Sequence, residues 1–202
     1  MTPINTVIFD LGNVLIDWDP RYLYRKLFNT DDEVEWFLEN ICDQDWNLKH
    51  DSGQLFSQGI LEKSKNFPQY IELIKAWYQR WEEMLGGPID ESVKILSELK
   101  EKGLLLYVLS NWSAETYPIA EERFDFLKWF DGKIISGEEG IVKPDVEIYK
   151  LLVKRYSLTP QQTVFIDDKF ENIKAAELIG IHGIHFQNGS KLRKDLQMLK
   201  LI

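Results

Sequence analysis

The stretch Ile4-Asn5-Thr6-Val7-Ile8-Phe9-Asp10 is a short run of mostly apolar, β-branched residues that stops at an acidic residue. The pattern recurs twice: residues 104–109 end at Ser110, and residues 163–166 end at Asp167. Near-continuous apolar runs of this length are typical of strands buried on both faces of a parallel sheet. We therefore expect three central strands, each followed by a polar residue.

Helical patterns separate these runs. Apolar residues recur at helical spacing in 89–102, 145–156 and 169–179, and the first and third of these segments stop at a glycine. Two weaker strand candidates lie at 133–136 and 182–186. Strands that alternate with helices predict an α/β fold, in which a doubly wound parallel sheet is covered by helices.

Residues 17–86 interrupt this alternation. They contain no convincing strand, and their apolar pattern indicates helices over 20–28, 31–41, 54–65 and 68–85. A Gly-Gly-Pro sequence at 86–88 closes the segment. We predict that residues 17–86 form a small α-helical cap domain inserted after the first strand, and that residues 1–16 and 87–202 form the α/β core.

Composition narrows the possible partners. The chain has 202 residues and a formal net charge of −9, which argues against nucleic acid or an anionic membrane surface as a partner. No apolar run approaches the roughly 20 residues that span a bilayer, and no signal peptide is visible. Cys42 is the only cysteine, so no intrachain disulfide is possible. We expect a cytoplasmic protein, and the sequence leaves its oligomeric state open.

The polar residues that follow the strands predict a single site. Ligands of an open parallel sheet bind beyond the carboxyl ends of its strands, where Asp10, Ser110-Asn111 and Asp167-Asp168 should meet. Lys143 lies in a loop after the fourth candidate strand and should reach the same edge. An anionic protein that binds an anionic ligand needs such a local cation, or a metal ion.

This residue set suits phosphoryl transfer. An ionised carboxylate such as Asp10 can attack as a nucleophile, but like charges repel when the target is a phosphate. A divalent cation held by Asp10 with Asp167 or Asp168 reduces that repulsion, and magnesium prefers such oxygen ligands. Ser110 and nearby backbone N–H groups can hold phosphoryl oxygens, and Lys143 adds fixed positive charge.

Four segments of the chain resemble, in order, the four motifs of the haloacid dehalogenase-like hydrolase superfamily. They are Val-Ile-Phe-Asp-Leu-Gly-Asn-Val-Leu at 7–15, Val-Leu-Ser-Asn at 108–111, Gly-Ile-Val-Lys-Pro-Asp at 140–145, and Val-Phe-Ile-Asp-Asp at 164–168 followed by Asn172. The resemblance spans residues 4 to about 186 and implies a Rossmann-like core with a small helical cap. The first motif and the Asp-Trp-Asp that follows it at 17–19 are also similar to a bacterial branch that includes phosphatases of sugar phosphates such as glucose 1-phosphate.

The resemblance implies a magnesium site. Asp10 resembles the family's nucleophile, which is also a metal ligand. The Gly12 carbonyl and Asp168 resemble the other protein ligands, and Asp167 resembles the acidic neighbour that supports the metal or its waters.

The resemblance also implies how phosphate is bound. Ser110 and Asn111 match the motif that contacts phosphate, and Lys143 matches the lysine that orders nucleophile and phosphate. Gly12 and Asn13, in the loop after the nucleophile, are expected beside the same phosphate.

Position 12 departs from the family pattern. Many phosphatases of the family have a second Asp two residues after the nucleophile, where it acts as general acid and base. Gly12 offers only backbone, so it can ligate a metal but cannot move a proton, and general acid–base catalysis is typically worth about 10²–10⁴-fold. Asp17, Asp19 and His50 are the candidates that we weigh as replacements.

Two tryptophans are candidates for substrate contact. Trp18 lies just past the first motif, where the chain leaves the site. Trp46 lies in a polar stretch between two predicted helices, where its ring could stack on a sugar. Both could equally belong to the core of the helical segment.

The sequence therefore predicts a magnesium-dependent phosphomonoesterase that acts on small phosphorylated metabolites such as sugar phosphates, through a phospho-aspartyl intermediate on Asp10. One alternative is a hydrolytic 2-haloacid dehalogenase, but this enzyme needs no metal and the Asp167-Asp168 pair would repel an anionic haloacid. Another is a catalytically weak phosphate-binding regulatory protein, which Gly12 suggests and the retained Asp10, Lys143 and Asp168 argue against. The expected partner is a small-molecule phosphate ester.

Overall fold

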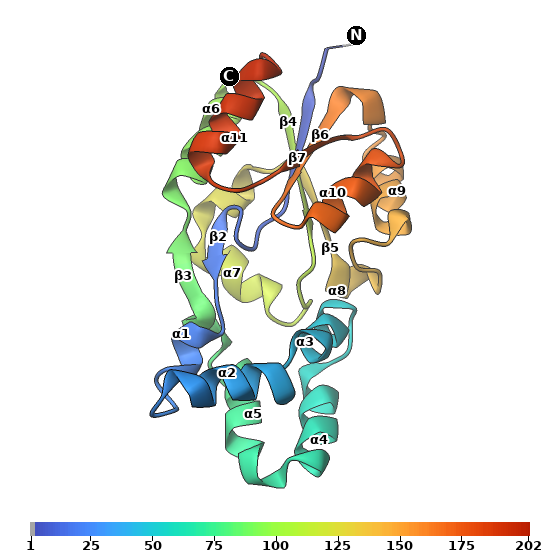
Figure 1. The fold of residues 1–202 in the computed structure, drawn as a ribbon. Coiled ribbons are helices and arrows are strands. Elements are labelled where there is room, and N and C mark those ends of the chain that lie inside the picture. Colours follow the sequence, from blue (N-terminus) through green and yellow to red (C-terminus); the bar gives the residue numbers. More distant parts are fainter. Residues whose placement is uncertain (1–2) are drawn as a thin grey trace.

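A five-stranded parallel sheet forms the centre of the protein in a computed structural model that describes residues 3–202 (Figure 1). The strand order is β5-β4-β1-β6-β7. The strands are β1 Thr6–Phe9, β4 Leu105–Ser110, β5 Gly132–Ile135, β6 Thr163–Asp167 and β7 His182–His185. The three strongly apolar runs of the sequence are therefore the three middle strands, and the two weaker candidates are the edges.

Strand β1 lies at the middle of the sheet, and its register aligns the strand ends. Thr6 pairs with Leu105 on one side and with Thr163 on the other, and all four residues of β1 are buried. Because neighbouring parallel strands run in step, the residues that follow β1, β4 and β6 emerge at the same edge.

Helices cover both faces of the sheet, which confirms the predicted α/β fold. Val7 and Phe9 pack on one face with α6 and α11, whereas Ile8 packs on the other with α9 and α10 (Figure 1). The helices after residue 88 are α6 Asp90–Glu101, α7 Tyr117–Arg123, α8 Ser136–Glu139, α9 Val146–Arg155, α10 Phe170–Glu177 and α11 Gly189–Met198. Short 3₁₀ turns occupy Pro68–Tyr70, Trp81–Met84, Asp125–Trp129 and Pro160–Gln162.

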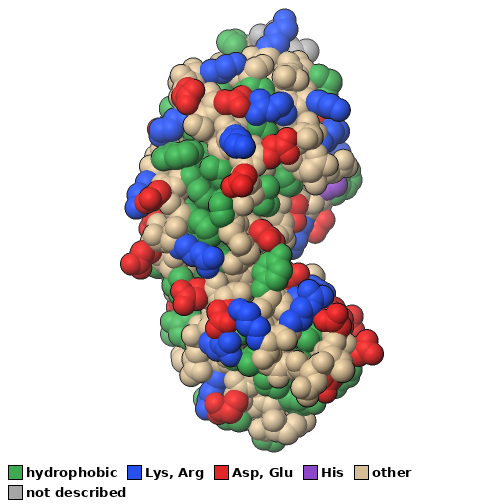
Figure 2. All heavy atoms as spheres, turned by 90° about the vertical axis from the view of Figure 1, so that its left-hand side faces the viewer, with side chains coloured by type: hydrophobic (Ala, Val, Ile, Leu, Met, Phe, Trp, Pro, Cys, Tyr) green, Lys and Arg blue, Asp and Glu red, His purple; other side chains and the backbone are tan. Residues whose placement is uncertain are grey.

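A second group of helices leaves the sheet after β1 and returns before α6. The group comprises α1 Arg21–Tyr24, α2 Asp31–Asn40, α3 Gln44–Asp51, α4 Phe56–Asn66 and α5 Ile71–Gln79. These helices lie together below the carboxyl edge of the sheet in Figure 1, and Figure 2 shows a narrower waist between this smaller lobe and the larger one. None of the helices within residues 3–202 has the length and apolar character that crossing a bilayer requires.

Two short strands, which the sequence did not reveal, connect the lobes. Strands β2 (Ile16–Trp18) and β3 (Leu85–Pro88) pair antiparallel in a separate two-stranded sheet. The helix predicted over 68–85 is wrong at its end, because α5 stops at Gln79. Gly86 and Gly87 are poor strand formers, so only the pairing partner stabilises β3 in an extended conformation.

Helix α3 was also missed. Its N-cap residue Asp43 accepts a hydrogen bond from the Trp46 backbone N–H at 2.7 Å, which is a standard helix start. The buried residues of α3 are Trp46 and His50, so the helix carries too few apolar residues for a helical period to be visible in the sequence.

Candidate active site

The predicted site residues converge at the carboxyl edge of the sheet. Asp10 directly follows β1, and Ser110 and Asp167 are the last residues of the neighbouring strands β4 and β6. Lys143 lies in the loop between α8 and α9 and reaches the same point. The structure therefore brings together four residues that are far apart in the sequence.

Asp10 is a buried carboxylate with one oxygen held in place. Its Oδ1 accepts hydrogen bonds from the Ser110 hydroxyl at 2.6 Å and from the Leu11 backbone N–H at 2.7 Å, and it lies 3.0 Å from the Lys143 Nζ. Within residues 3–202, no donor is bonded to Oδ2 of Asp10. Burial raises the pKa of Asp10 to about 6, and the charge of Lys143 opposes this increase. One oxygen is thus fixed, and the other is left to meet a ligand.

Lys143 forms ion pairs with two acidic residues of the site, Asp10 and Asp167. Its side chain is 1% exposed, and its Nζ lies 2.6 Å from Oδ2 of Asp167. Burial alone would lower the pKa of Lys143, but the charges of Asp10 and Asp167 override this effect and raise it. The ammonium group is therefore a permanent positive charge inside the site.

The Asn111 side chain holds the loop that carries Lys143, and its predicted contact with phosphate stays a prediction. Its Oδ1 accepts a hydrogen bond from the Lys143 backbone N–H at 2.8 Å, and its Nδ2 donates to the Lys143 carbonyl at 2.9 Å. Both ends of the amide are used to hold the loop. Asn111 lines the pocket, but its side chain positions Lys143.

Asp167 and Asp168 differ in how fully their oxygens are occupied. Asp167 is fully buried and accepts hydrogen bonds from Lys143, from Asn172 at 3.0 Å on both oxygens, and from the Lys169 backbone N–H at 2.8 Å. Asp168 is half-buried, and burial together with the charge of Asp167 raises its pKa. Asp168 is therefore the more available of the two carboxylates.

The three carboxylates have the chemistry of a site for a hard cation. One oxygen from each of Asp10, Asp167 and Asp168 lies within 4.8 Å of the others. All are oxygen donors, which suit magnesium better than the softer transition metals. The raised pKa values of Asp10 and Asp168 reflect mutual repulsion as well as burial, and a bound cation would relieve that repulsion.

A pocket of about 870 Å³ opens above this cluster, between the sheet and the helical segment. From the core it is lined by Asp10, Gly12, Asn13, Ser110, Asn111, Lys143 and Asp168, among others. From the other side it is lined by Asp17, Trp18, Asp19, Asp51, Trp77 and Trp81, among others. A ligand in this pocket would touch both lobes.

Gly12, in the turn after Asp10, lines the pocket without a side chain. A side chain at Gly12 would meet no atom within 4 Å of its Cβ. Asn13 is exposed and has φ 57°, a left-handed conformation that Asn tolerates better than most residues. Its Oδ1 accepts a hydrogen bond from the Trp18 backbone N–H at 3.2 Å, which ties the turn to β2. The Asn13 side chain therefore supports the turn.

The two candidate tryptophans have different environments. Trp18 lines the pocket and is half-buried. Trp46 does not line it: the ring is 4% exposed, lies edge-on to Trp77, and donates its Nε1–H to the Gly59 carbonyl at 3.3 Å. The predicted substrate contact of Trp46 is therefore corrected to a core role, because α3 turns this residue into the interior.

His50 is excluded as the missing proton donor. Its ring is fully buried and stacked on Phe56, outside the pocket. Nδ1 lies 3.0 Å from the Gln54 carbonyl and must donate to it, so Nε2 is unprotonated, buried and without a hydrogen-bond partner among the residues described. Burial lowers the pKa of His50, which disfavours the charged form further.

Asp17 and Asp19 do line the pocket, but both carboxylates have partners. Asp17 accepts a hydrogen bond from the Tyr22 hydroxyl at 2.7 Å, and Asp19 lies 3.2 Å from the Arg21 guanidinium. Each of these carboxylates is therefore already engaged by a neighbouring side chain.

Asp51 is an acidic residue of the pocket that sequence reasoning missed. It is the last residue of α3, and its Oδ2 accepts a hydrogen bond from the Asn47 Nδ2 at 3.0 Å. Burial raises the pKa of Asp51 to about 7, and the charge of Lys169 opposes this increase. The N-cap residue Asp43 could have revealed α3 in the sequence. A helix that begins there places Asn47 and Asp51 one turn apart on the same face.

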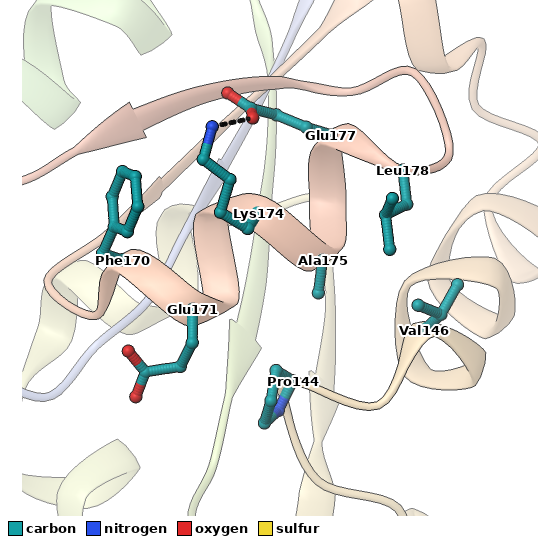
Figure 3. A pocket seen from close by; sticks show the side chains of 8 residues that line it. All are labelled: Pro144, Val146, Phe170, Glu171, Lys174, Ala175, Glu177 and Leu178. Atoms are coloured by element: carbon teal, nitrogen blue, oxygen red, sulfur yellow. Dashed lines mark hydrogen bonds and ion pairs between the residues drawn. The ribbon is translucent and has the colours of Figure 1, made fainter.

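A second, shallower hollow lies outside this site, between α10 and the start of α9 (Figure 3). Ala175 and Leu178 face Pro144 and Val146 across it. Lys174, at its rim, is paired with Glu177 at 2.7 Å. This hollow contains none of the predicted site residues.

Comparisons with known proteins agree with this geometry. The family model for haloacid dehalogenase-like hydrolases matches residues 4–180. A sesquiterpene phosphatase of Aspergillus oryzae is 28% identical over 98% of this chain and 97% of its own length. A glyceraldehyde 3-phosphate phosphatase of Methanocaldococcus jannaschii is 31% identical over 96% of this chain and 89% of its own.

A solved structure shares the fold. It is a HAD family enzyme of Bacteroides thetaiotaomicron in complex with magnesium and inorganic phosphate, with a TM-score of 0.68 and 23% identity over 92% of this chain and 96% of that one. Together with the motif residues gathered at the carboxyl edge of the sheet, these matches lead to one assignment. The chain is an enzyme of the haloacid dehalogenase-like hydrolase family.

Proposed function

We propose that this enzyme is a magnesium-dependent phosphomonoesterase that uses Asp10 as a nucleophile on small phosphorylated metabolites such as sugar phosphates. The observation that carries the proposal is the convergence of Asp10, Asp167 and Asp168 around the ammonium group of Lys143. Two phosphatases are similar to nearly the whole chain, and the Bacteroides structure of similar fold contains both magnesium and phosphate. We also propose that residues 17–86 act as a cap domain on the core of residues 1–16 and 87–202.

In the proposed reaction, Asp10, Lys143 and Ser110 each have a separate role. An Asp10 carboxylate oxygen forms a bond to phosphorus while the ester P–O bond breaks, which gives a phospho-aspartyl intermediate and a leaving oxygen that must take up a proton to depart as the alcohol. The Lys143 Nζ supplies positive charge to the phosphoryl oxygens as negative charge develops on them. The Ser110 hydroxyl holds Oδ1 of Asp10 and so orients the carboxylate. Water then cleaves the acyl phosphate and restores Asp10.

The residues present fit a magnesium ion. Asp10, the Gly12 carbonyl and Asp168 would hold it, and Asp167 would support it through the fixed network with Asn172. When bound, magnesium would offset the repulsion between the phosphate dianion and the carboxylates.

The acidic cluster also argues against the dehalogenase alternative. A 2-haloacid is itself a carboxylate, and it would enter a site that already holds three acidic groups. Burial raises the pKa of Asp10 and the charges of Asp167 and Asp168 raise it further, so another anion there is unfavourable without a metal.

The test is turnover of p-nitrophenyl phosphate. We expect the purified enzyme to require magnesium, to lose activity in excess chelator, and to lose more than about a thousandfold in kcat as Asp10→Asn, because an amide cannot attack phosphorus. Asp90→Asn is the matched control: it removes a carboxylate that is exposed on α6 and outside the pocket.

Three results would contradict the proposal. Full activity in excess chelator would show that the reaction does not use a metal ion. Release of halide from a 2-haloacid, without phosphatase activity, would identify a dehalogenase. Saturable phosphate binding without turnover would identify a binding protein.

A further inference from the structure

The site described so far has no group that can protonate the leaving oxygen of a phosphate ester. Position 12 is glycine, His50 is buried outside the pocket, and the carboxylates of Asp17 and Asp19 are engaged by Tyr22 and Arg21. An alkoxide is a poor leaving group, so ester cleavage without a proton donor forfeits about 10²–10⁴-fold in rate. A proton donor for this site must therefore come from another residue that lines the pocket.

Asp51 lines the same pocket as Asp10, but it belongs to the helical segment, where it is the last residue of α3. The last turn of α3 is docked against the core at this point, because the Ser136 hydroxyl donates a hydrogen bond to the Asp51 carbonyl at 2.5 Å. The following turn approaches the core just as closely: a Cβ at Gly53 would lie 3.3 Å from the Gly137 carbonyl oxygen. Asp51 is therefore held at a fixed position relative to the sheet, although it belongs to the helical segment.

The environment of the Asp51 side chain favours the protonated form. Burial, together with a smaller contribution from the negative charge of Asp10, raises the pKa of Asp51 to about 7. Lys169 and Lys143 act in the opposite direction without cancelling the effect of burial. Near neutral pH, a substantial fraction of Asp51 therefore carries a proton that it can give away.

Other charged groups on the elements packed around α3 are engaged elsewhere. Lys63 of α4 lies 3.2 Å from Asp43, and Glu139 of α8 lies 2.6 Å from Arg155. Two more carboxylates accept hydrogen bonds: Glu115 from the Phe56 backbone N–H and Glu62 from the Gln54 amide. The charges that act directly on Asp51 are thus those of the active site itself.

We propose that Asp51 is the general acid and base of this enzyme and replaces the side chain that Gly12 lacks. The inference rests on the proposed phosphatase function and deepens it. It places proton transfer on the helical segment, whereas nucleophile, lysine and metal ligands lie on the core.

The two half-reactions balance. In the first, the Asp51 carboxyl gives its proton to the ester oxygen as the P–O bond breaks and the bond between Asp10 and phosphorus forms, so the alcohol leaves neutral and Asp51 becomes a carboxylate. In the second, Asp51 takes a proton from the water that attacks phosphorus. Inorganic phosphate leaves, Asp10 is free again, and Asp51 is protonated for the next cycle.

The experiment compares leaving groups in the wild type and in Asp51→Asn. The substrates are a series of phosphate monoesters from p-nitrophenyl phosphate, whose leaving group needs no proton, to simple alkyl phosphates. We expect Asp51→Asn to retain most of its kcat/KM on p-nitrophenyl phosphate and to lose about 10²–10⁴-fold on alkyl phosphates. Asp32→Asn, an exposed carboxylate of α2, is the control and should match the wild type throughout.

A pH profile gives a second readout that a structural role would not affect. With an alkyl phosphate, wild-type kcat/KM should fall about tenfold per unit above a pH of about 7, where Asp51 loses its proton, and this descending limb should be absent in Asp51→Asn. If Asp51→Asn does not fold by circular dichroism, Asp51→Ser provides the same comparison.

Two outcomes would overturn the inference. One is an equal loss of kcat/KM on all leaving groups, which would mark Asp51 as structural. The other is a wild-type rate that already falls steeply with leaving-group pKa. Both leave the phosphatase itself intact, whereas absence of magnesium-dependent p-nitrophenyl phosphate turnover by the wild type would defeat the underlying function.

Discussion

Lys143→Met should destabilise the protein far more than loss of an ordinary lysine. The Lys143 side chain is 1% exposed and lies between Asp10, 11% exposed, and Asp167, 0% exposed. Met keeps most of the volume of the side chain but removes the charge, so two acidic groups remain in the interior without their cation. Removal of one partner from a buried ion pair typically costs about 3–5 kcal/mol.

The hydrogen bonds that remain place the expected cost at the lower end of this range. Asp167 keeps its bonds from Asn172 and from the Lys169 backbone N–H, and Asp10 keeps those from Ser110 and the Leu11 backbone N–H. We therefore expect a loss of about 3 kcal/mol in the free energy of unfolding, or about two powers of ten in the unfolding equilibrium constant.

Urea unfolding followed by tryptophan fluorescence measures this loss. The experiment is done in the presence of a chelator, because a bound cation would replace the missing charge. Lys150→Met is the control: Lys150 is 54% exposed and pairs with Glu147 within α9, so its loss should cost less than about 1 kcal/mol.

A double variant sharpens the test. Adding Asp167→Asn to Lys143→Met removes the stranded negative charge, so the double variant should be more stable than Lys143→Met alone. The reasoning is refuted if Lys143→Met costs no more than Lys150→Met, or if the second substitution only adds to the loss.

Two further predictions concern Gly12 and His50. Gly12→Asp should fold, since a Cβ at this position meets no atom within 4 Å. In the Asp51→Asn background, Gly12→Asp should restore part of the rate on alkyl phosphates in a steady-state assay. No gain in rate by this double variant would show that position 12 cannot deliver a proton here. Burial lowers the pKa of His50 in the folded protein. Below the ordinary histidine pKa of about 6.5, the unfolded chain therefore binds a proton that the folded protein does not bind. The free energy of unfolding then decreases as the pH is lowered, by at most about 1.36 kcal/mol per pH unit. Between pH 7 and pH 5, wild type should lose more stability in urea than His50→Phe does, and equal losses would mean that His50 titrates normally in the folded protein.

The sequence predicted the core of the site well, because the relevant signals are local. Each middle strand is an apolar run followed directly by its functional residue, and a parallel sheet brings such residues to one edge whatever lies between them. Asp10, Ser110 and Asp167 could therefore be placed together from the sequence, although their roles remain predictions.

The parts that the sequence did not reveal depend on tertiary contacts. Strand β3 is extended only because β2 pairs with it, and its glycines carry the opposite local signal. Trp46 was misplaced because α3 has too few buried residues to show a period. Asp51 looked like one of many acidic residues, and only burial against the core distinguishes it. In the same way, the side chain of Asn111 bonds to a loop that lies 32 residues away.

The position of β1 at the middle of the sheet also determines the order in which the protein can be assembled during synthesis. The first strand leaves the ribosome before either of its neighbours exists, since its partners begin at Leu105 and Thr163. Helices α1–α5 are complete before the second strand of the main sheet has been made, and some of their contacts, such as the stacking of Phe56 in α4 on His50 in α3, lie within this group. Because β2 and β3 pair with each other, folding of these helices brings the two ends of the inserted segment together and shortens the effective loop that β1 and β4 must close. The segment that lines one side of the pocket in the finished enzyme is thus also the segment that can prepare the chain for the pairing of β1 with β4.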